Sequence, residues 1–405
     1  MNYKNLILNN FLNSIPYAFT SMGFFLINYL IAYLYSGEVF GEFALYLNTV
    51  IILSVILRFG IEHSINIFYA NYSIDVFPLV SIIFLLNNIV FVSLNYFYFS
   101  FDLYVVMGAF MYGLSEIILK QSISLGILRK YVVTKIFYTF LPIFLLILID
   151  KYFTLLPGTH NLKTFLIIGL LIHNIYLYLS LNKNYINLVN NFDLKIFKKL
   201  TRFSILAFIA SFSSIIIQKF DIFILNHYLN DLQLVTIFVL LGQLGSSLSL
   251  FSNIFLPKFT QLYIKTIKKN KYKFSIKIIH MLNKKIIYSN LIISFFVIVL
   301  SIPYLYFINE NYFKYYNLIF FFIGGYFINS LTLSSGIVLT VSKEIKYQTY
   351  RYVFSAIISV SLNIALVPIY GIYGSALSFL ITYVSLFIFG FIFLNKYINQ
   401  LKNNG

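Results

Sequence analysis

The sequence predicts an all-α membrane protein whose chain crosses the bilayer many times in two similar halves. Of its 405 residues, 60% are hydrophobic and only 10% are charged, and the mean hydropathy is +0.86. Soluble globular domains carry roughly 25% charged residues. Apolar stretches recur along the whole chain, and a helix of about 20 apolar residues crosses the ~30 Å hydrocarbon core of a bilayer. We therefore expect a polytopic helical protein.

Polar clusters divide the chain into twelve expected spans. The first is too long for the apolar core of a signal peptide and has no small-residue cleavage site behind it, so we interpret it as an uncleaved span. The expected spans lie at residues 11–35, 42–70, 76–98, 103–126, 134–149, 163–181, 202–229, 233–262, 281–306, 315–341, 348–368 and 372–394. Pro368 is expected to end the eleventh span and residues 369–373 to form a turn, in which Gly371 and Gly374 free the backbone.

The charged residues predict the orientation of the chain. Most of the 29 basic residues, Lys135 and Arg351 among them, fall in every second connection, whereas acids such as Glu38 and Glu42 mark the others. The positive-inside rule then places both termini in the cytoplasm. The net charge of +17 is thus explained by loop charges rather than by a nucleic-acid site. Residues 265–277, which are rich in lysine, are also suited to contact with anionic lipid.

The polar segment at residues 182–202 separates six expected spans from six, which predicts two lobes, residues 1–190 and 191–405. An even number of spans preserves orientation, so the halves would be related by a parallel pseudo-two-fold repeat. Residues in corresponding spans agree with this relationship, since Ser21, Asn28 and Glu38 have the same spacing as Ser214, Asp221 and Asp231.

Ionisable residues inside expected spans are costly and mark candidate functional positions. Arg58 and Glu62 lie four residues apart, as do Glu116 and Lys120, and residues at this spacing share a helix face. Two interpretations stay open. Each pair is either a local ion pair that helps a helix to insert and dock, or part of a water-filled transport path.

Lys219 and Asp221 cannot neutralise each other in a helix, because residues two apart point to different faces. Each needs a partner elsewhere or an aqueous cavity. A stripe of small and polar residues leads to this acid along one face of the seventh span: Ser204, Ala207, Ser211, Ser214, Gln218 and Asp221.

Similar stripes include Asn28 in the first span and Asn253 in the eighth. Helix packing accounts for the small residues. It accounts poorly for Gln218, Asp221 and Asn253, so a lumen lined by the first, seventh and eighth spans is the competing interpretation.

Signatures of catalysis and of metal binding are lacking in the sequence. There is no HExxH, no glycine-rich phosphate loop followed by lysine and no cysteine. His63 and His173 are isolated in the sequence, and we interpret them as interior side chains rather than metal ligands. These observations favour transport over catalysis.

Three segments carry a family resemblance: SGEVFGEFALYLNTVIILSVILRFGIEHSINIFYA at residues 36–70, QKFDIFILNHYLNDLQLVTIFVLLGQL at residues 218–244, and LNIALVPIYGIYGSALSF at residues 362–379. Together they resemble the polysaccharide transporters, Wzx-type O-antigen flippases, of the multidrug, oligosaccharidyl-lipid and polysaccharide (MOP) exporter superfamily. The resemblance implies a MATE-like fold of two six-helix lobes around a central cavity. It also implies translocation of undecaprenyl-diphosphate-linked oligosaccharide from the inner to the outer leaflet of the bacterial inner membrane, by alternating access, for surface polysaccharide synthesis.

The resemblance also suggests roles for the polar residues. Candidate contacts for the diphosphate or for acidic sugars are Arg58, Lys120 and Lys219, and candidate lumen residues are Asn28, Ser211, Ser214, Gln218 and Asn253. Candidate coupling sites for a proton or a sodium ion are Glu62, Glu116 and Asp221. No cofactor or metal site is expected, and the expected partners are the lipid-linked glycan, membrane lipid and other polysaccharide-assembly membrane proteins. Three basic and three acidic residues cancel, which favours a neutral glycan. The stretch at residues 362–379 is expected to be purely structural.

Three alternatives stay open. A multidrug or cation antiporter of the same superfamily would share the fold but favour unpaired acids, of which Asp221 is one. A membrane glycan polymerase usually has a large basic outside loop, whereas the outside loops here are short and acidic. A lipid flippase of peptidoglycan synthesis would be expected to have fourteen spans rather than twelve.

Overall fold

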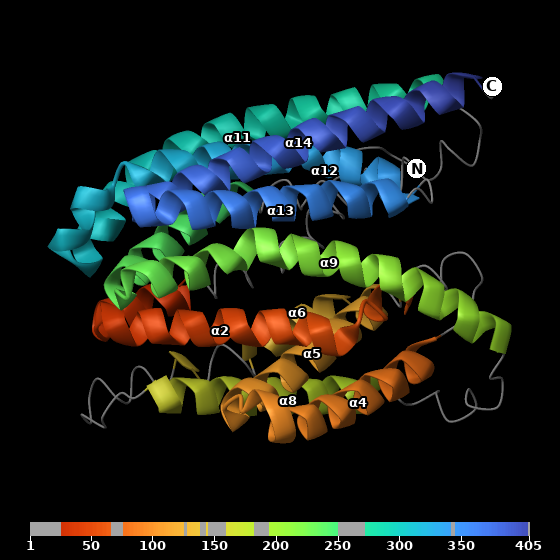
Figure 1. The fold of residues 1–405 in the computed structure, drawn as a ribbon, viewed down its shortest axis with the longest axis horizontal. Coiled ribbons are helices and arrows are strands. Elements are labelled where there is room, and N and C mark those ends of the chain that lie inside the picture. Colours follow the sequence, from red (N-terminus) through yellow and green to blue (C-terminus); the bar gives the residue numbers. More distant parts are fainter. Residues whose placement is uncertain are drawn as a thin grey trace. The chain divides into compact units, whose positions relative to one another are not determined.

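The computed structural model describes residues 26–65, 76–124, 128–137, 143–144, 159–181, 194–249, 272–341 and 345–403 (Figure 1). These residues are almost entirely helical, and none of them forms a β-strand. Within this part of the chain, 10 helices are long and apolar enough to cross a membrane. The all-α class expected from the composition and the apolar periodicity is confirmed.

The described residues form two compact units, one within residues 16–212 and the other within residues 213–405. We call them the first and second lobes. The first lobe contains α2 (Gly37–Arg58), α4 (Phe77–Leu94) with the short helix η1 (Asn95–Phe99), α5 (Leu103–Ser124), α6 (Leu128–Lys135) and α8 (Thr159–Leu181). Helix α5 is central, because it packs against α2, α4, α6 and α8. Its Ile117 and Ile118 lie fully buried in the apolar core with Phe84 of α4.

Helix α9 (Leu194–Leu229) begins in the first lobe and ends in the second. The second lobe continues with a helix at Leu232–Ser249. It then contains α11 (Tyr272–Ile308), η5 (Glu310–Tyr315), α12 (Leu318–Val341), α13 (Ile345–Tyr370) and α14 (Ile372–Asn403). Helix α14 packs along both α12 and α13. Aromatic rings of Phe322, Phe379 and Tyr383 contact one another in the core between α12 and α14.

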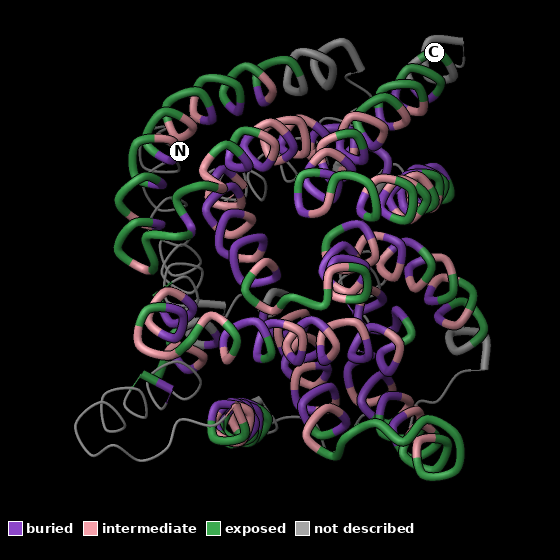
Figure 2. Tube along the Cα trace, turned by 60° about the vertical axis from the view of Figure 1, so that its left-hand side comes forward, coloured by how far each residue is buried: buried purple, intermediate pink, exposed green. Residues whose placement is uncertain are grey.

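The surface of the helices is largely apolar, and buried polar side chains accompany the apolar core. Helix α11 shows this most clearly, since Ile292, Phe295, Phe296 and Leu300 are each more than half exposed. Figure 2 shows exposed and buried residues alternating along the helical turns. Lipid tails contact such a surface, so the exposed apolar residues do not destabilise the fold in a membrane.

Most of the expected spans match the described helices closely. The first and fifth spans, at residues 11–35 and 134–149, lie largely outside the described residues, although residues 26–34 are helical. The eighth span is described only up to Ser249.

The connection between α13 and α14 is shorter than expected. Helix α13 continues through Pro368 to Tyr370, and a single residue, Gly371 with φ +57°, makes the turn. Its N–H donates to the Val367 carbonyl at 2.8 Å, as in a left-handed helix cap. A Cβ on Gly374 would lie 2.3 Å from the Leu366 carbonyl oxygen, so this glycine lets the two helix ends touch. The expected five-residue turn is therefore wrong, because the glycine closes the corner alone.

Candidate functional site

Helix α2 ends inside the apolar region at a left-handed turn formed by Phe59 (φ 48°) and Gly60 (φ 70°). A Cβ at Gly60 would lie 2.5 Å from both the Phe208 nitrogen and the Ser204 carbonyl oxygen of α9. The Phe59 and Phe208 rings stack at 4.6 Å. The continuous second span expected at residues 42–70 is therefore wrong: the chain breaks where the backbone of α9 approaches, and only glycine fits at the contact.

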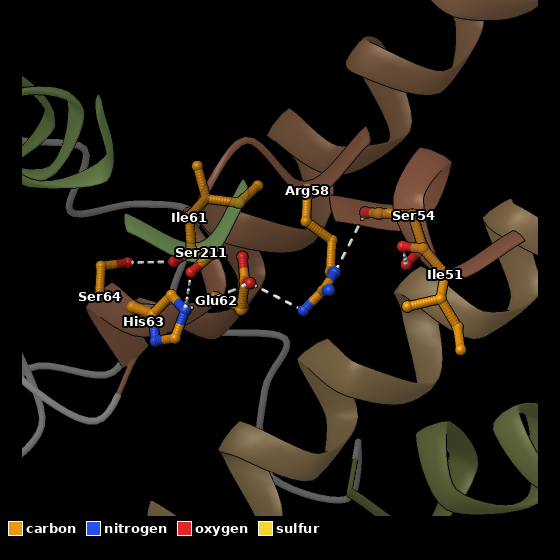
Figure 3. A network of polar contacts seen from close by, with 8 residues as sticks. All are labelled: Ile51, Ser54, Arg58, Ile61, Glu62, His63, Ser64 and Ser211. Carbon is orange, nitrogen blue, oxygen red and sulfur yellow. Dashed lines mark hydrogen bonds and ion pairs between the residues drawn. The ribbon is translucent and has the colours of Figure 1, made fainter. Parts of the chain in front are cut away.

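An ion pair closes across this break (Figure 3). The Arg58 Nη1 donates to Glu62 Oε1 at 2.7 Å, and the Arg58 Nε donates to the Ser54 carbonyl at 3.1 Å. Arg58 is 7% exposed and Glu62 is 1% exposed. The second carboxylate oxygen of Glu62 is buried and accepts no hydrogen bond from any described residue. The Glu62 Oε2 atom can thus accept a further hydrogen bond, although burial of an unpaired polar group costs free energy.

His63 connects this pair to α9. Its Nε2 lies 2.9 Å from the Ser211 hydroxyl and 3.6 Å from Glu62 Oε1 (Figure 3). Ser211 was expected to line a lumen from its place in the polar stripe, and the structure brings it to His63. This contact could not be predicted from the sequence, because only the packing of α9 on the α2 break brings residues 63 and 211 together.

Glu116 and Lys120 are half-buried on α5, and they do not approach each other within ion-pair distance. Lys120 interacts electrostatically with Glu62, whereas Glu116 interacts with Lys135 of α6. The local ion pair, one of the two interpretations of Glu116 and Lys120, is therefore not formed.

Lys135 was assigned to a cytoplasmic loop from the sequence, but it lies half-buried at the end of α6. Its ammonium donates to the Tyr131 hydroxyl at 3.2 Å, and that hydroxyl also lies 2.8 Å from Ser115 on α5. The His173 ring packs edge-on against Tyr131 at 5.0 Å. The first lobe thus contains a polar cluster that runs from α2 across α5 to α6 and α8.

A second polar cluster surrounds Asp221 of α9, which is 2% exposed. Its Oδ1 accepts from Asn363 at 2.9 Å and from Ser359 at 3.5 Å, both on α13. Asn363 also donates to Ser378 at 2.8 Å and accepts from Ser375 at 3.1 Å, both on α14. Every one of these partners is neutral, so Asp221 is an acid held by amide and hydroxyl groups alone within the described residues.

This cluster gives residues 362–379 polar contacts that the sequence did not predict. Asn363, Ser375 and Ser378 belong to that stretch and are completely buried. The turn at Gly371 folds α14 back on α13, which brings Ser375 and Ser378 to Asn363, and Asn363 bonds Asp221. Ser359 and Asn363 are four residues apart and Ser375 and Ser378 are three apart, which puts each pair on one helix face; these spacings were the signal available in the sequence.

The remaining candidates are dispersed. Gln218 is exposed and donates to Ser214 at 3.1 Å. Lys219 is half-buried, and no described acid forms an ion pair with it. Asn28 is 1% exposed, and its carbonyl oxygen has no described donor. Asn253 lies outside the described residues.

Arg351 was also counted as a loop charge, yet it is 1% exposed between α12, α13 and α14. With Lys135 it changes the balance of interior charges. In the described residues, the buried or half-buried acids without a surface partner are Glu62, Glu116 and Asp221, and the corresponding cations are Arg58, Lys120, Lys135, Lys219 and Arg351. Among the described residues, buried or half-buried cations therefore outnumber such acids, whereas the sequence predicted equal numbers within the spans. No group of three His, Asp or Glu side chains suited to a metal occurs in the described residues.

The described residues form a helical fold of membrane-spanning length with charged side chains in its interior. It is similar to the inward-facing structure of a multidrug resistance MATE family transporter of the MOP superfamily, with a TM-score of 0.72, 13% identity, and 95% of each chain covered. It is also similar to the lipid II flippase MurJ in an inward closed conformation, with a TM-score of 0.69, 15% identity, and 97% of this chain and 90% of that chain covered.

A third similar structure is a MOP superfamily transporter from Pyrococcus furiosus, with a TM-score of 0.64, 13% identity, and 98% of this chain and 96% of that chain covered. No protein-family model and no curated protein sequence matches the chain. The two-lobe, all-helical fold expected from the sequence is therefore confirmed by its similarity to solved structures and not by sequence similarity.

Proposed function

We propose that this protein is a flippase that moves a polyprenyl-diphosphate-linked oligosaccharide from the inner to the outer leaflet of a bacterial inner membrane. The carrier lipid is undecaprenyl diphosphate, and the glycan is a repeat unit of a surface polysaccharide. Movement follows alternating access, with the glycan and diphosphate in the protein interior and the polyprenyl chain in lipid. The fold shared with MATE and MurJ transporters supports a transporter of this kind.

The charge balance of the described interior side chains carries the proposal. A diphosphate brings negative charge into the membrane, and cations that exceed acids compensate for it. The surplus comes from Lys135 and Arg351, one in each lobe. A transporter of organic cations would benefit from the opposite balance. The surplus concerns the diphosphate and does not select between a neutral and an acidic glycan.

Arg58 is the best candidate for contact with phosphate. Its guanidinium bonds Glu62 through Nη1, and Arg is suited to bidentate recognition of phosphate oxygens. Lys120 supports the same position, because it interacts electrostatically with Glu62. When phosphate binds Arg58, the carboxylate of Glu62 loses its counter-charge and gains affinity for a proton or a cation. Substrate and coupling ion would then meet at the break in α2.

Asp221 is the candidate coupling site of the second lobe. A carboxylate among amide and hydroxyl oxygens can hold a proton or a sodium ion, since hard cations prefer oxygen ligands. The partners are Asn363 and Ser359. Replacement of Asp221 by Asn should keep these hydrogen bonds while removing the charge, so transport should lose its dependence on the ion gradient with little change in stability.

Deletion of the gene tests the proposal. Lipid-linked glycan retained on the cytoplasmic leaflet is the expected result. Complementation with Arg58→Gln should fail at normal protein level, whereas Arg202→Gln should succeed, because Arg202 is exposed on α9. Full surface glycan in the deletion strain would overturn the proposal. Translocated but unpolymerised units would instead indicate a polymerase.

A multidrug or cation antiporter is the second candidate, and one observation favours it. Asp221 is an interior acid with no basic partner among the described residues, as a site for a cationic substrate would require. Unchanged glycan together with altered efflux of a cationic dye in the deletion strain would support this function.

A further inference from the structure

His63 lies between the buried Glu62 carboxylate and helix α9 (Figure 3). Its Nε2 lies 2.9 Å from the Ser211 hydroxyl and 3.6 Å from Glu62 Oε1. One ring nitrogen thus faces a neutral hydroxyl and a carboxylate together. Because an imidazole ring takes up and releases a proton near neutral pH, the proton on this nitrogen can take part in either contact.

The partners of Glu62 differ in their ability to pass a proton on. Among the described residues, two lie within ion-pair distance of this carboxylate, Arg58 and His63. Arginine stays protonated in proteins, so Arg58 neutralises the acid but cannot give it a proton. The His63 side chain is 37% exposed, whereas that of Glu62 is 1% exposed. The titratable partner of the carboxylate is therefore also the one that reaches the surface of the first lobe.

The backbone fixes the His63 ring in this place. The left-handed turn at Phe59 and Gly60 packs against α9, where a Cβ on Gly60 would lie 2.5 Å from the Phe208 nitrogen. The His63 N–H donates to the Gly60 carbonyl at 3.3 Å, so the ring leaves the chain directly after this contact. A ring held in this way can exchange a proton with one partner while it stays hydrogen-bonded to the other.

The charges around the ring respond to a ligand on Arg58. Four charged groups act on His63, two cations and two acids: Arg58, Lys120, Glu62 and Glu116. The cations oppose a positive charge on the ring and the acids favour it. A diphosphate on Arg58 would compensate for one cation, so the ring would gain affinity for a proton. It would also free Glu62 Oε1, which Arg58 holds at 2.7 Å, to accept a proton from the ring.

We propose that His63 is the proton shuttle of Glu62 and that the coupling ion of the first lobe is a proton. This inference rests on the proposed flippase function, because it assigns the coupling ion of that same site. Water at the exposed side of the ring supplies the proton that converts His63 to its imidazolium form.

The transfer to Glu62 removes two opposite charges in one step. The imidazolium gives its Nε2 proton to Glu62 Oε1, so an N–H bond breaks and an O–H bond forms. The neutral ring keeps its proton on Nδ1. Its Nε2 then accepts a hydrogen bond from the Ser211 hydroxyl, which already lies at 2.9 Å. Ser211 is thus a positioning residue that stabilises the ring after it has given up the proton.

The first test measures surface glycan in the deletion strain that carries variants of the full-length chain at equal protein level. His63→Gln keeps an amide that can bond Ser211 but cannot carry a proton, so surface glycan should fall by about tenfold or more. The matched control is His160→Gln, because the His160 Nε2 likewise lies 2.8 Å from a hydroxyl, that of Tyr104. This control should export as the wild type does. Wild-type export by His63→Gln would overturn the proposal, since an amide can replace a ring that only packs.

The second test follows proton transfer in the purified full-length protein and needs no glycan. It uses the Arg58→Gln variant, in which Glu62 lacks its counter-charge as it would beside a bound diphosphate. A rapid acid jump should produce the infrared band of a protonated carboxyl group, which Glu62→Gln identifies by its loss. If Arg58→Gln does not fold, the jump is made on the wild type to a more acidic pH.

Removal and replacement of the ring then identify the shuttle. Adding His63→Ala should slow the rise of the Glu62 band by about tenfold or more. Free imidazole should restore the rate in proportion to its concentration. The matched control compound is 1,3-dimethylimidazolium, which has a similar ring but no exchangeable N–H proton, and it should restore nothing.

The outcomes separate this proposal from the flippase function. Equal infrared rates with and without His63, equal rescue by both compounds, or no Glu62 band on either background would overturn the shuttle. If these results come with normal glycan export by the wild type, the flippase function stands. The expected infrared result in a chain whose wild type restores no surface glycan would overturn the flippase function and support proton transfer from His63 to Glu62.

Discussion

Arg58 and Glu62 are joined by a 2.7 Å ion pair across a left-handed turn, so their contact bridges a broken helix rather than lying along one helix face. The pair is almost completely buried, and the second Glu62 oxygen has no described donor. A buried pair adds little net stability, but removal of one partner leaves an uncompensated charge. This asymmetry makes the pair a sensitive point of the first lobe.

Replacement of Arg58 by Ala should lower the free energy of unfolding by about 3–5 kcal/mol, because the buried Glu62 carboxylate would lose its ion-pair partner. The double variant Arg58→Met with Glu62→Leu should recover much of that loss, since neither charge remains. Both variants should fail to export glycan. Melting temperature and surface glycan measure the two effects, and equal destabilisation in the single and double variants would contradict a penalty from the unpaired Glu62 carboxylate.

Replacement of Gly60 by Ala should strongly destabilise the first lobe. The left-handed backbone alone costs roughly 1–2 kcal/mol for a residue with a Cβ, and the new methyl group would lie 2.5 Å from the backbone of α9. Gly242→Ala is the matched control, because the nearest neighbour of its Cβ would be a Phe322 ring carbon at 3.4 Å. The yield of folded protein after detergent extraction distinguishes the two, and a normal yield for the Gly60 variant would contradict the described break.

Replacement of Asn363 by Ala should cost about 1–3 kcal/mol by leaving Asp221 without its main donor. The additional change Asp221→Asn should reduce this cost, since a neutral amide is less expensive to bury than a carboxylate. Ser385→Ala serves as a control, because that hydroxyl bonds Ser355 and not the cluster. A double-mutant cycle of melting temperatures measures the coupling, and strict additivity would argue against a direct contact.

The exposed pair of Lys163 and Glu42 should matter far less than the buried one. Its atoms lie 2.9 Å apart, but the Glu42 side chain is 49% exposed. Surface pairs of this kind contribute about 1 kcal/mol or less. Lys163→Met should therefore lower the melting temperature slightly at low salt and not at high salt. A loss as large as that of Arg58→Ala, independent of salt, would contradict this ranking.

The fold could be predicted from the sequence because apolar length and charge placement are summed over many residues. The ends of individual helices were not predicted correctly. Phe59 and Gly60 end α2 because the backbone of α9 lies against Gly60, and nothing near residue 60 in the sequence specifies that contact. Pro368 was expected to end a helix, yet the chain stays helical for two more residues because Gly371 supplies the turn.

The candidate site was predicted only in part. Arg58, Glu62 and Asp221 were identified because ionisable residues in apolar stretches are conspicuous. Their partners were not, since Asn363 reaches Asp221 through the packing of α13 on α9. Arg351 was misassigned for a different reason: it lies near the start of an apolar stretch, where a loop charge and a buried charge have the same sequence pattern.

The one-residue turn at Gly371 also bears on how the chain enters the membrane. Two helices joined by a single residue leave almost no segment to be carried across separately, so α13 and α14 are best inserted together as a hairpin. Their facing serines and Asn363 then meet one another during insertion instead of facing hydrocarbon one helix at a time. The turn that shapes the mature second lobe would thus also protect its most polar helices at synthesis.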